Sequence, residues 1–210
     1  MLLKLINFPQ ISYKELACHN EGLIALTGGP KGGVGRAILN GQNEAAENLL
    51  NLLREVFDDR LYVEIMRHKT TEEIRTEPTF LDLAEKMEIP IVATNEVFFS
   101  DPNMYEAHEA LLCISEGKTL LDDSRRTSTA EHYFKSAEDM GKLFSDLPVA
   151  IDNTLVIAQR CSFMVEERSP MLPRAGGVTA NGSENNLITD LCQQGLKARL
   201  EHEGIPKAST

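Results

Sequence analysis

The segment Ile91-Val-Ala-Thr-Asn-Glu-Val-Phe-Phe99 joins a short apolar run to polar side chains that follow it directly. The run over residues 89–94 is typical of a buried strand, and Pro90 is tolerable because it stands near the start of that strand. Asn95 and Glu96 then fall at its carboxyl end. Functional groups of α/β proteins gather at such ends, so this segment predicts both a strand and a candidate site.

Two earlier apolar runs, over residues 22–27 and 61–66, predict strands of the same kind. Helical periodicity separates the runs and follows the last one. We expect a short helical turn over 34–39 and helices over 43–57, 70–87 and 101–114. Strands that alternate with helices pair in parallel through βαβ crossovers. Three strands are too few to close a barrel, which needs about eight in the standard case, so the pattern fits either an open sheet or a barrel with missing elements.

From about Gly117 the pattern changes, and residues 120–133 are polar and loop-like. Ser136 and Asp139 have the spacing of a capping box, which predicts the start of a helix. A second helix is expected over 150–161. Prolines and glycines over 170–182 indicate a linker, and the apolar spacing over 183–203 predicts a final amphipathic helix.

The composition is that of a globular protein, with 42% hydrophobic and 25% charged residues. No apolar run reaches the roughly 18 residues that a membrane span needs, and the first residues lack the pattern of a secretory signal. We therefore expect a cytoplasmic protein with no membrane partner. The net charge of −11 is unsuited to gripping DNA, because binding a polyanion needs clustered Lys and Arg. We expect little direct nucleic-acid binding and a surface that faces protein or solvent.

The cysteines are widely separated and include no Cys-x-x-Cys pair; they are Cys18, Cys113, Cys161 and Cys192. Such spacing fits neither a zinc knuckle nor a disulfide framework. We expect all four to be ordinary reduced thiols.

A carboxylate at the position of Glu96 could bind a metal ion, but a catalytic metal centre needs three or more converging protein ligands. Phe98, two residues further on, offers no donor atom. A surface or capping carboxylate is therefore the favoured interpretation of Glu96. The glycine-rich loop over 27–35 lies where backbone amides can cradle a phosphate. It matches neither the Walker nor the dinucleotide-binding pattern, so a tight turn between strand and helix is favoured.

Two histidines and an acidic pair also have chemical potential. His68 follows the second predicted strand and could serve as a ligand or an acid–base group, although a loop histidine is favoured. His108 lies on a predicted helix without the second histidine of a zincin helix, which favours packing against the helix face. Asp122 and Asp123 could form a metal-binding pair, and a solvated loop beside two arginines explains them equally well.

Several segments of the chain occur together, and in the same order, in one family. They are Glu21-Gly-Leu-Ile-Ala-Leu-Thr-Gly-Gly29, Tyr62-Val-Glu-Ile65 with His68 after it, Pro90-Ile-Val-Ala-Thr-Asn-Glu96, Glu106-Ala-His-Glu109, Lys135-Ser-Ala-Glu-Asp-Met140 and Met171-Leu-Pro173. The ordered series resembles the PHP (polymerase and histidinol phosphatase) domain of bacterial DNA polymerase III alpha subunits. The resemblance extends from about residue 10 to about residue 200.

The resemblance implies a distorted (β/α) barrel of about seven strands, of which this chain is similar to the C-terminal half. The expected fold is therefore a partial barrel of parallel strands with crossover helices, followed by a helical extension. Residues 1–165 would form this half of the PHP domain, and residues 166–210 a linker and first helix leading into the polymerase core. The strands with the opening His-x-His motif and the palm with its catalytic aspartates would lie outside this chain.

Three positions depart from the metal-binding members of the family. Those members have a cysteine where this chain has Gly29, and an aspartate and a histidine where it has Glu96 and Phe98. The resemblance therefore implies no competent metal centre, with Glu96 a vestigial ligand position. We expect no catalytic and no cofactor-binding residue in this piece, and Mg²⁺ only in the parent polymerase.

The leading hypothesis is a non-catalytic structural and partner-docking module of the polymerase. Its expected partners are a proofreading exonuclease subunit and the remainder of the polymerase chain. The alternative is a metal-dependent PHP phosphoesterase or 3′–5′ exonuclease. Half a barrel leaves unpaired strand edges and a bare apolar face, so we also expect this chain to fold only marginally by itself.

Overall fold

The strands predicted from the apolar runs form one parallel sheet. The computed structural model describes residues 11–170 and 184–203. Within these residues the sheet has the order β1 (Ala25–Leu26), β2 (Leu61–Met66) and β3 (Ile91–Thr94). Ala25 pairs with Leu61, and Val63 pairs with Ile91, both in parallel. The described strands form an open sheet, which confirms the predicted α/β class and fits a partial PHP-type barrel.

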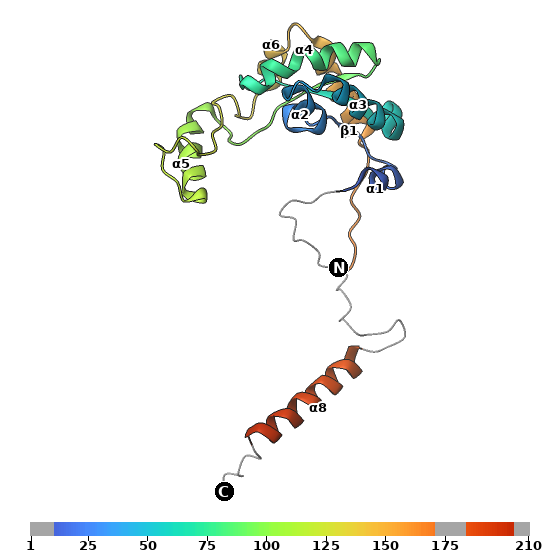
Figure 1. The fold of residues 1–210 in the computed structure, drawn as a ribbon, viewed down its shortest axis with the longest axis vertical. Helices are drawn as coiled ribbons and strands as arrows, with labels where there is room; N and C mark the ends of the chain where they lie inside the picture. The colour runs from blue at the N-terminus through green and yellow to red at the C-terminus, as the bar shows by residue number, and fades with distance from the viewer. Residues whose placement is uncertain (1–10, 171–183, 204–210) are drawn as a thin grey trace. The chain divides into compact units, whose positions relative to one another are not determined.

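Helices connect and flank these strands (Figure 1). They are α1 (Tyr13–Cys18), α2 (Gly33–Leu39), α3 (Asn43–Phe57), α4 (Thr71–Lys86), α5 (Tyr105–Glu116), α6 (Ala137–Leu143) and α7 (Pro148–Arg160), with the short 3₁₀ helices η1 (Gly29–Lys31), η2 (Asp58–Arg60) and η3 (Pro102–Met104). The helices predicted over 34–39, 43–57 and 70–87 are confirmed to within a residue at each end. The predicted capping box at the start of α6 forms, because the Ser136 hydroxyl accepts from the Asp139 amide and the Asp139 carboxylate accepts from the Ser136 amide.

Two strands are shorter than the apolar runs that predicted them. β1 has only two residues because Ala25 already pairs with Leu61, the first residue of β2, so residues 22–24 have no partner in that strand. The guanidinium of Arg60 instead binds the carbonyl oxygens of Asn20 and Leu23, at 2.5 and 2.9 Å. β3 begins at Ile91 because the amide of Ile89 bonds to Ala84 at the end of α4, at 2.9 Å. Pro90 has no amide hydrogen to donate to a neighbouring strand.

The core lies where β2 meets the helices. Leu61, Val63 and Ile65 point into a cluster that includes Leu50 of α3 and Phe80 of α4. Leu50 and Leu61 have no exposed surface. Helix α7 packs along β3, where the side-chain amide of Asn153 donates to the carbonyl oxygen of Ile91 at 2.8 Å. Burial on this scale is the main favourable contribution to folding.

The outer edge of β1 is the least covered part of the sheet. Leu23 and Leu26 are 49% and 40% exposed, and among the described strands β1 pairs with β2 alone. This is the bare edge expected of half a barrel. Marginal folding of the chain by itself stays a prediction.

The chain divides into two compact units, Met1–Ser162 and Phe163–Thr210. In the second unit, α8 (Glu184–Glu203) is the final helix predicted from the sequence. Its Ile188, Leu191 and Leu196 side chains are each more than half exposed. The predicted linker falls almost wholly outside the described residues, and the functional division at residue 165 stays a prediction. Among the described helices, none is long and apolar enough to cross a membrane.

Candidate functional site

The residues that follow the three strands meet at one edge of the sheet. A buried carboxylate, Glu64 of β2, ties this edge together. One of its oxygens accepts the amide hydrogen of Gly28 at 2.9 Å, and the other accepts the hydroxyl of Thr94 at 2.6 Å. Since Gly28 follows β1 and Thr94 ends β3, this single side chain joins all three strands where their carboxyl ends converge.

His68 is the most buried polar residue at this edge, with 1% of its surface exposed. Its Nδ1 lies 2.7 Å from the Glu73 carboxylate, which also accepts the backbone amide hydrogen of His68 at 2.6 Å. Glu73 belongs to a capping box with Thr70 at the start of α4. Burial pushes the pKa of Glu73 up, but its bonds from His68 and Thr70 outweigh this, so the pKa lies below its ordinary value.

The second ring nitrogen of His68 is also engaged. The backbone amide nitrogen of Glu96 lies 3.1 Å from Nε2. The side-chain oxygen of Asn95 lies 3.0 Å from the same nitrogen, and its amide group donates to the carbonyl oxygen of Tyr133. His68 is a loop histidine, as the sequence favoured, because it lies between β2 and α4; it is buried, and both of its ring nitrogens have partners. It joins the end of β2 to the end of β3 and the start of α4.

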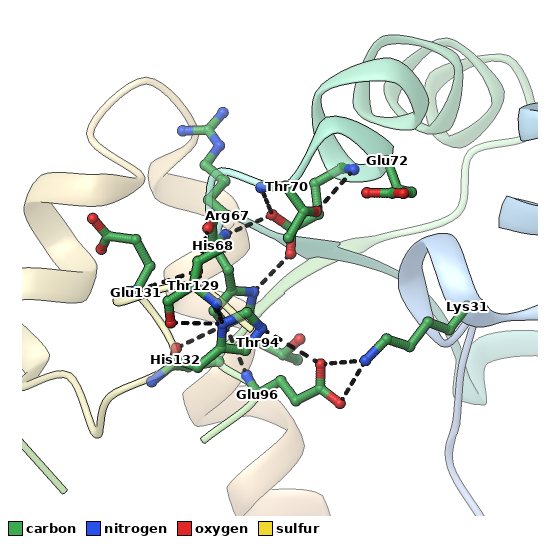
Figure 2. A network of polar contacts seen from close by, with 12 residues as sticks. Lys31, Arg67, His68, Thr70, Glu72, Thr94, Glu96, Thr129, Glu131 and His132 are labelled. Carbon is green, nitrogen blue, oxygen red and sulfur yellow. Dashed lines mark hydrogen bonds and ion pairs between the residues drawn. The ribbon is translucent and has the colours of Figure 1, made fainter. Parts of the chain in front are cut away.

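Glu96 is held by an ammonium group. Lys31 Nζ donates to both carboxylate oxygens of Glu96, at 3.0 and 2.8 Å. Figure 2 shows the two side chains pointing toward each other from separate segments. The Glu96 side chain is 33% exposed, and His132 Nε2 lies 3.9 Å from the same carboxylate. Glu96 is thus a partly exposed carboxylate whose ion-pair partner is Lys31 of η1.

A column of aromatic rings covers the strand ends. His132 stacks on His68 at 4.2 Å between ring centroids and on Phe98 at 4.6 Å, and Phe98 stacks on His108 at 5.4 Å. His132 is 4% exposed. Burial and the neighbouring His68 lower its pKa. His108 packs on a helix face as the sequence indicated, whereas the role of His132 carried no recognisable sequence signal.

Residues 125–135, here called the cleft loop, bring His132 to this position. The Thr129 hydroxyl donates to the carbonyl oxygen of His68 at 2.7 Å. The buried carboxylate of Glu109 on α5 accepts the amide and hydroxyl hydrogens of Ser128, at 2.9 and 2.8 Å, and pairs with Arg125. Arg125 therefore serves a buried anchor on α5, whereas the sequence placed it beside Asp122 and Asp123 in a solvated loop.

A cleft of about 750 Å³ lies between the cleft loop and the start of α4. Its lining includes Lys31, Lys69, Thr71, Glu96, Phe98 and Leu112. Cationic and anionic side chains both line it, so no single sign of charge dominates.

Gly29 opens η1 in a backbone conformation that side chains rarely adopt. Its φ of +51° lies in the left-handed region, and a Cβ added there would approach Met66 Sδ to 3.2 Å. The neighbouring amides are engaged within the protein, since Gly28 donates to Glu64 and Gly32 donates to the carbonyl oxygen of Gly28 at 2.9 Å. These contacts support the interpretation of this loop as a tight turn.

The residues at the strand ends do not fit a multinuclear metal centre. Glu96 binds Lys31, Phe98 has no donor atom, and both ring nitrogens of His68 have partners within the protein. In the part of the chain that the structure describes, no cluster of three or more His, Cys, Asp or Glu side chains could hold a metal ion. All four cysteines are free thiols, as predicted, and Cys113 alone among them is buried.

Arg67, directly before His68, fixes the helices behind the site. Its guanidinium binds Glu77 of α4, Asp146, and the carbonyl oxygen of Leu143 at the end of α6. It also lies 4.7 Å from the centre of the Phe144 ring. Asp146 first, and then Glu77, raise the pKa of Arg67 above its ordinary value.

Comparison with known proteins gives one consistent family. The PHP domain family model matches residues 3–68. The chain is 45% identical over 194 residues to the DNA polymerase III subunit alpha of Caulobacter vibrioides, which is 92% of this chain and 17% of that protein. The corresponding subunit of Rickettsia bellii is 44% identical over 91% of this chain and 16% of its own length. That of Haemophilus influenzae is 37% identical over 92% of this chain and 17% of its own length.

This chain thus spans about a sixth of the length of the relatives that it matches. The chain is therefore homologous to DNA polymerase III alpha subunits over about nine-tenths of its own length, and it matches the PHP region of those proteins.

Proposed function

We propose that this chain is a structural and partner-docking PHP module of a DNA polymerase III alpha subunit, and that it carries out no chemistry itself. The observation that carries the proposal is the state of the strand-end site. Where a metal-dependent enzyme would present converging ligands, this site has a carboxylate bound to a lysine and a closed column of rings.

The partners proposed are a proofreading exonuclease subunit and the rest of the polymerase chain, both in the cytoplasm. The net charge of −11 supports a surface that faces protein more than one that follows a DNA backbone. Polymerisation, with its Mg²⁺, would then belong to the part of the alpha subunit that lies outside this chain.

Docking is tested on the full-length alpha subunit that carries this chain. Arg67→Met removes the guanidinium that joins α4 to α6 and so loosens the module from within. We expect weaker binding of the exonuclease subunit in isothermal titration calorimetry, with primer extension by the alpha subunit retained. Lys142→Met is the control, because it removes an exposed lysine that pairs with Glu138, four residues earlier in α6.

The catalytic alternative is tested on the same proteins. Nuclease activity of the alpha subunit on a single-stranded oligonucleotide is measured with Mn²⁺ or Zn²⁺ added. We expect none that depends on Glu96. Metal-dependent cleavage that disappears in Glu96→Gln would establish the phosphoesterase or exonuclease alternative. Equal exonuclease affinity of the Arg67→Met and Lys142→Met proteins would contradict the docking role.

A further inference from the structure

One ammonium group joins the two outer strands of the sheet at their carboxyl ends. Lys31 lies in η1, directly after β1, and Glu96 follows β3, 65 residues further along the chain. Because β2 lies between these strands, the Lys31–Glu96 pair spans the middle of the strand-end site. Its two bonds, at 2.8 and 3.0 Å, engage both oxygens of the carboxylate.

The backbone that carries Lys31 is fixed from several sides. Pro30, the second residue of η1, is buried. A Cβ at Gly35 of α2 would come within 2.2 Å of the carbonyl oxygen of Gly29, so α2 packs tightly against this turn. The Lys31 ammonium also lies 5.8 Å from the centre of the Phe98 ring, where the ring face attracts a cation. The turn thus aims Lys31 at the residues that follow β3.

A divalent ion placed on Glu96 would meet this ammonium. Like charges at contact distance repel each other strongly outside bulk water. The other nitrogen donor close to Glu96 is His132 Nε2, 3.9 Å from the carboxylate. A metal held by Glu96 and His132 would therefore have to displace Lys31.

We propose that the ammonium of Lys31 supplies the positive charge that neutralises Glu96 in the strand-end site, where a divalent metal ion would otherwise do so. The same ammonium excludes a divalent ion from Glu96. This inference rests on the proposed function, in which the module has no metal centre. It goes further by naming the residue that keeps the remaining carboxylate neutralised. The lack of further metal ligands and the charge of Lys31 then both act against metal binding at Glu96.

A second ion pair elsewhere in the chain provides a matched control. Lys86 binds Glu47 at 2.6 Å, and these side chains are 61% and 35% exposed, close to the 74% and 33% of Lys31 and Glu96. The control pair joins α4 to α3 and lies at no strand end. Removing a surface lysine changes the net charge of the chain equally at both places. A difference in Mn²⁺ binding between Lys31→Met and Lys86→Met is therefore caused by the strand-end site.

The experiment measures Mn²⁺ binding by electron paramagnetic resonance to the full-length alpha subunit that carries this chain, and Mn²⁺ bound elsewhere in that subunit is common to all variants. We expect Lys31→Met to lower the Mn²⁺ dissociation constant by about tenfold or more relative to the unaltered chain, because the competing charge is gone. Lys31→Arg and Lys86→Met should match the unaltered chain. The gain should vanish in Lys31→Met/Glu96→Gln. As a second measurement, added Mn²⁺ should raise the melting temperature of Lys31→Met alone.

The outcomes separate the two proposals. Equal Mn²⁺ binding by Lys31→Met and Lys86→Met would overturn the inference and leave the proposed function standing. Stoichiometric Mn²⁺ on the unaltered chain, lost in Glu96→Gln, would overturn the proposed function and the inference together. A gain in Lys31→Met that survives Glu96→Gln would overturn the inference by placing the ion elsewhere.

Discussion

Replacing Glu73 by glutamine tests whether its buried carboxylate holds the strand-end site together. The carboxylate accepts three hydrogen bonds, from the His68 backbone at 2.6 Å, from His68 Nδ1 at 2.7 Å and from the Thr70 backbone at 3.2 Å. Glutamine has nearly the same shape but one acceptor oxygen, and its amide group would face a donor. Hydrogen bonds to a charged acceptor each contribute about 1.5–3 kcal/mol.

Losing one or two such bonds gives an expected destabilisation of about 3 kcal/mol near pH 7. The lowered pKa of Glu73 adds a pH signature. Because the folded carboxyl group has the lower pKa, its stabilisation is present above the unfolded value of 4.5 and is lost as pH falls through the folded value. The difference between the two proteins should therefore shrink on acidification.

Urea unfolding followed by circular dichroism measures this difference at a series of pH values. Glu72→Gln is the matched control, because Glu72 also lies in the first turn of α4 but is exposed. It carries the same interaction with the helix dipole, and we expect its effect to stay within about 0.5 kcal/mol. The reasoning is refuted if Glu73→Gln costs no more than Glu72→Gln, or if its cost is the same at every pH.

Three further substitutions test the surroundings of the site. Arg67→Met should cost about 3 kcal/mol in urea unfolding, because it leaves the half-buried Glu77 unpaired; a loss below that of Lys142→Met would contradict the role of the guanidinium. Glu88→Gly should raise stability by about 1 kcal/mol in thermal unfolding, because Glu88, which follows the C-cap of α4, has a left-handed φ of +53°; a decrease in stability would contradict this reasoning. His132 has a lowered pKa, so its stabilising effect is present above the unfolded value of 6.5 and is lost as pH falls from there toward the folded value. His132→Phe should flatten the stability profile between about pH 7 and 5, and an unchanged slope would assign that pH dependence to another group.

Local patterns in the sequence predicted where several helices begin and end. The apolar spacing over 43–57 gave the bounds of α3, and the hydroxyl and carboxylate of Ser136 and Asp139 marked the start of α6. Such signals act within one or two turns, so they survive in any fold. The extents of β1 and β3 were less well predicted, because Arg60 and the end of α4 engage backbone groups that the apolar runs alone would assign to strands.

The sequence by itself was enough to predict the resemblance to the PHP region, because residue identity in an ordered series of motifs needs no coordinates; the loss of metal ligands at Gly29 and Phe98 stays a prediction. Only the tertiary structure decided what the remaining polar groups do. It placed Lys31 on Glu96, buried His68 against Glu73, and brought His132 over His68. Lys31 lies 65 residues before its partner Glu96, and His132 lies 34 residues after its stacking partner Phe98. Contacts of this kind depend on how parallel strands bring distant segments to a common edge, and no local pattern records that path.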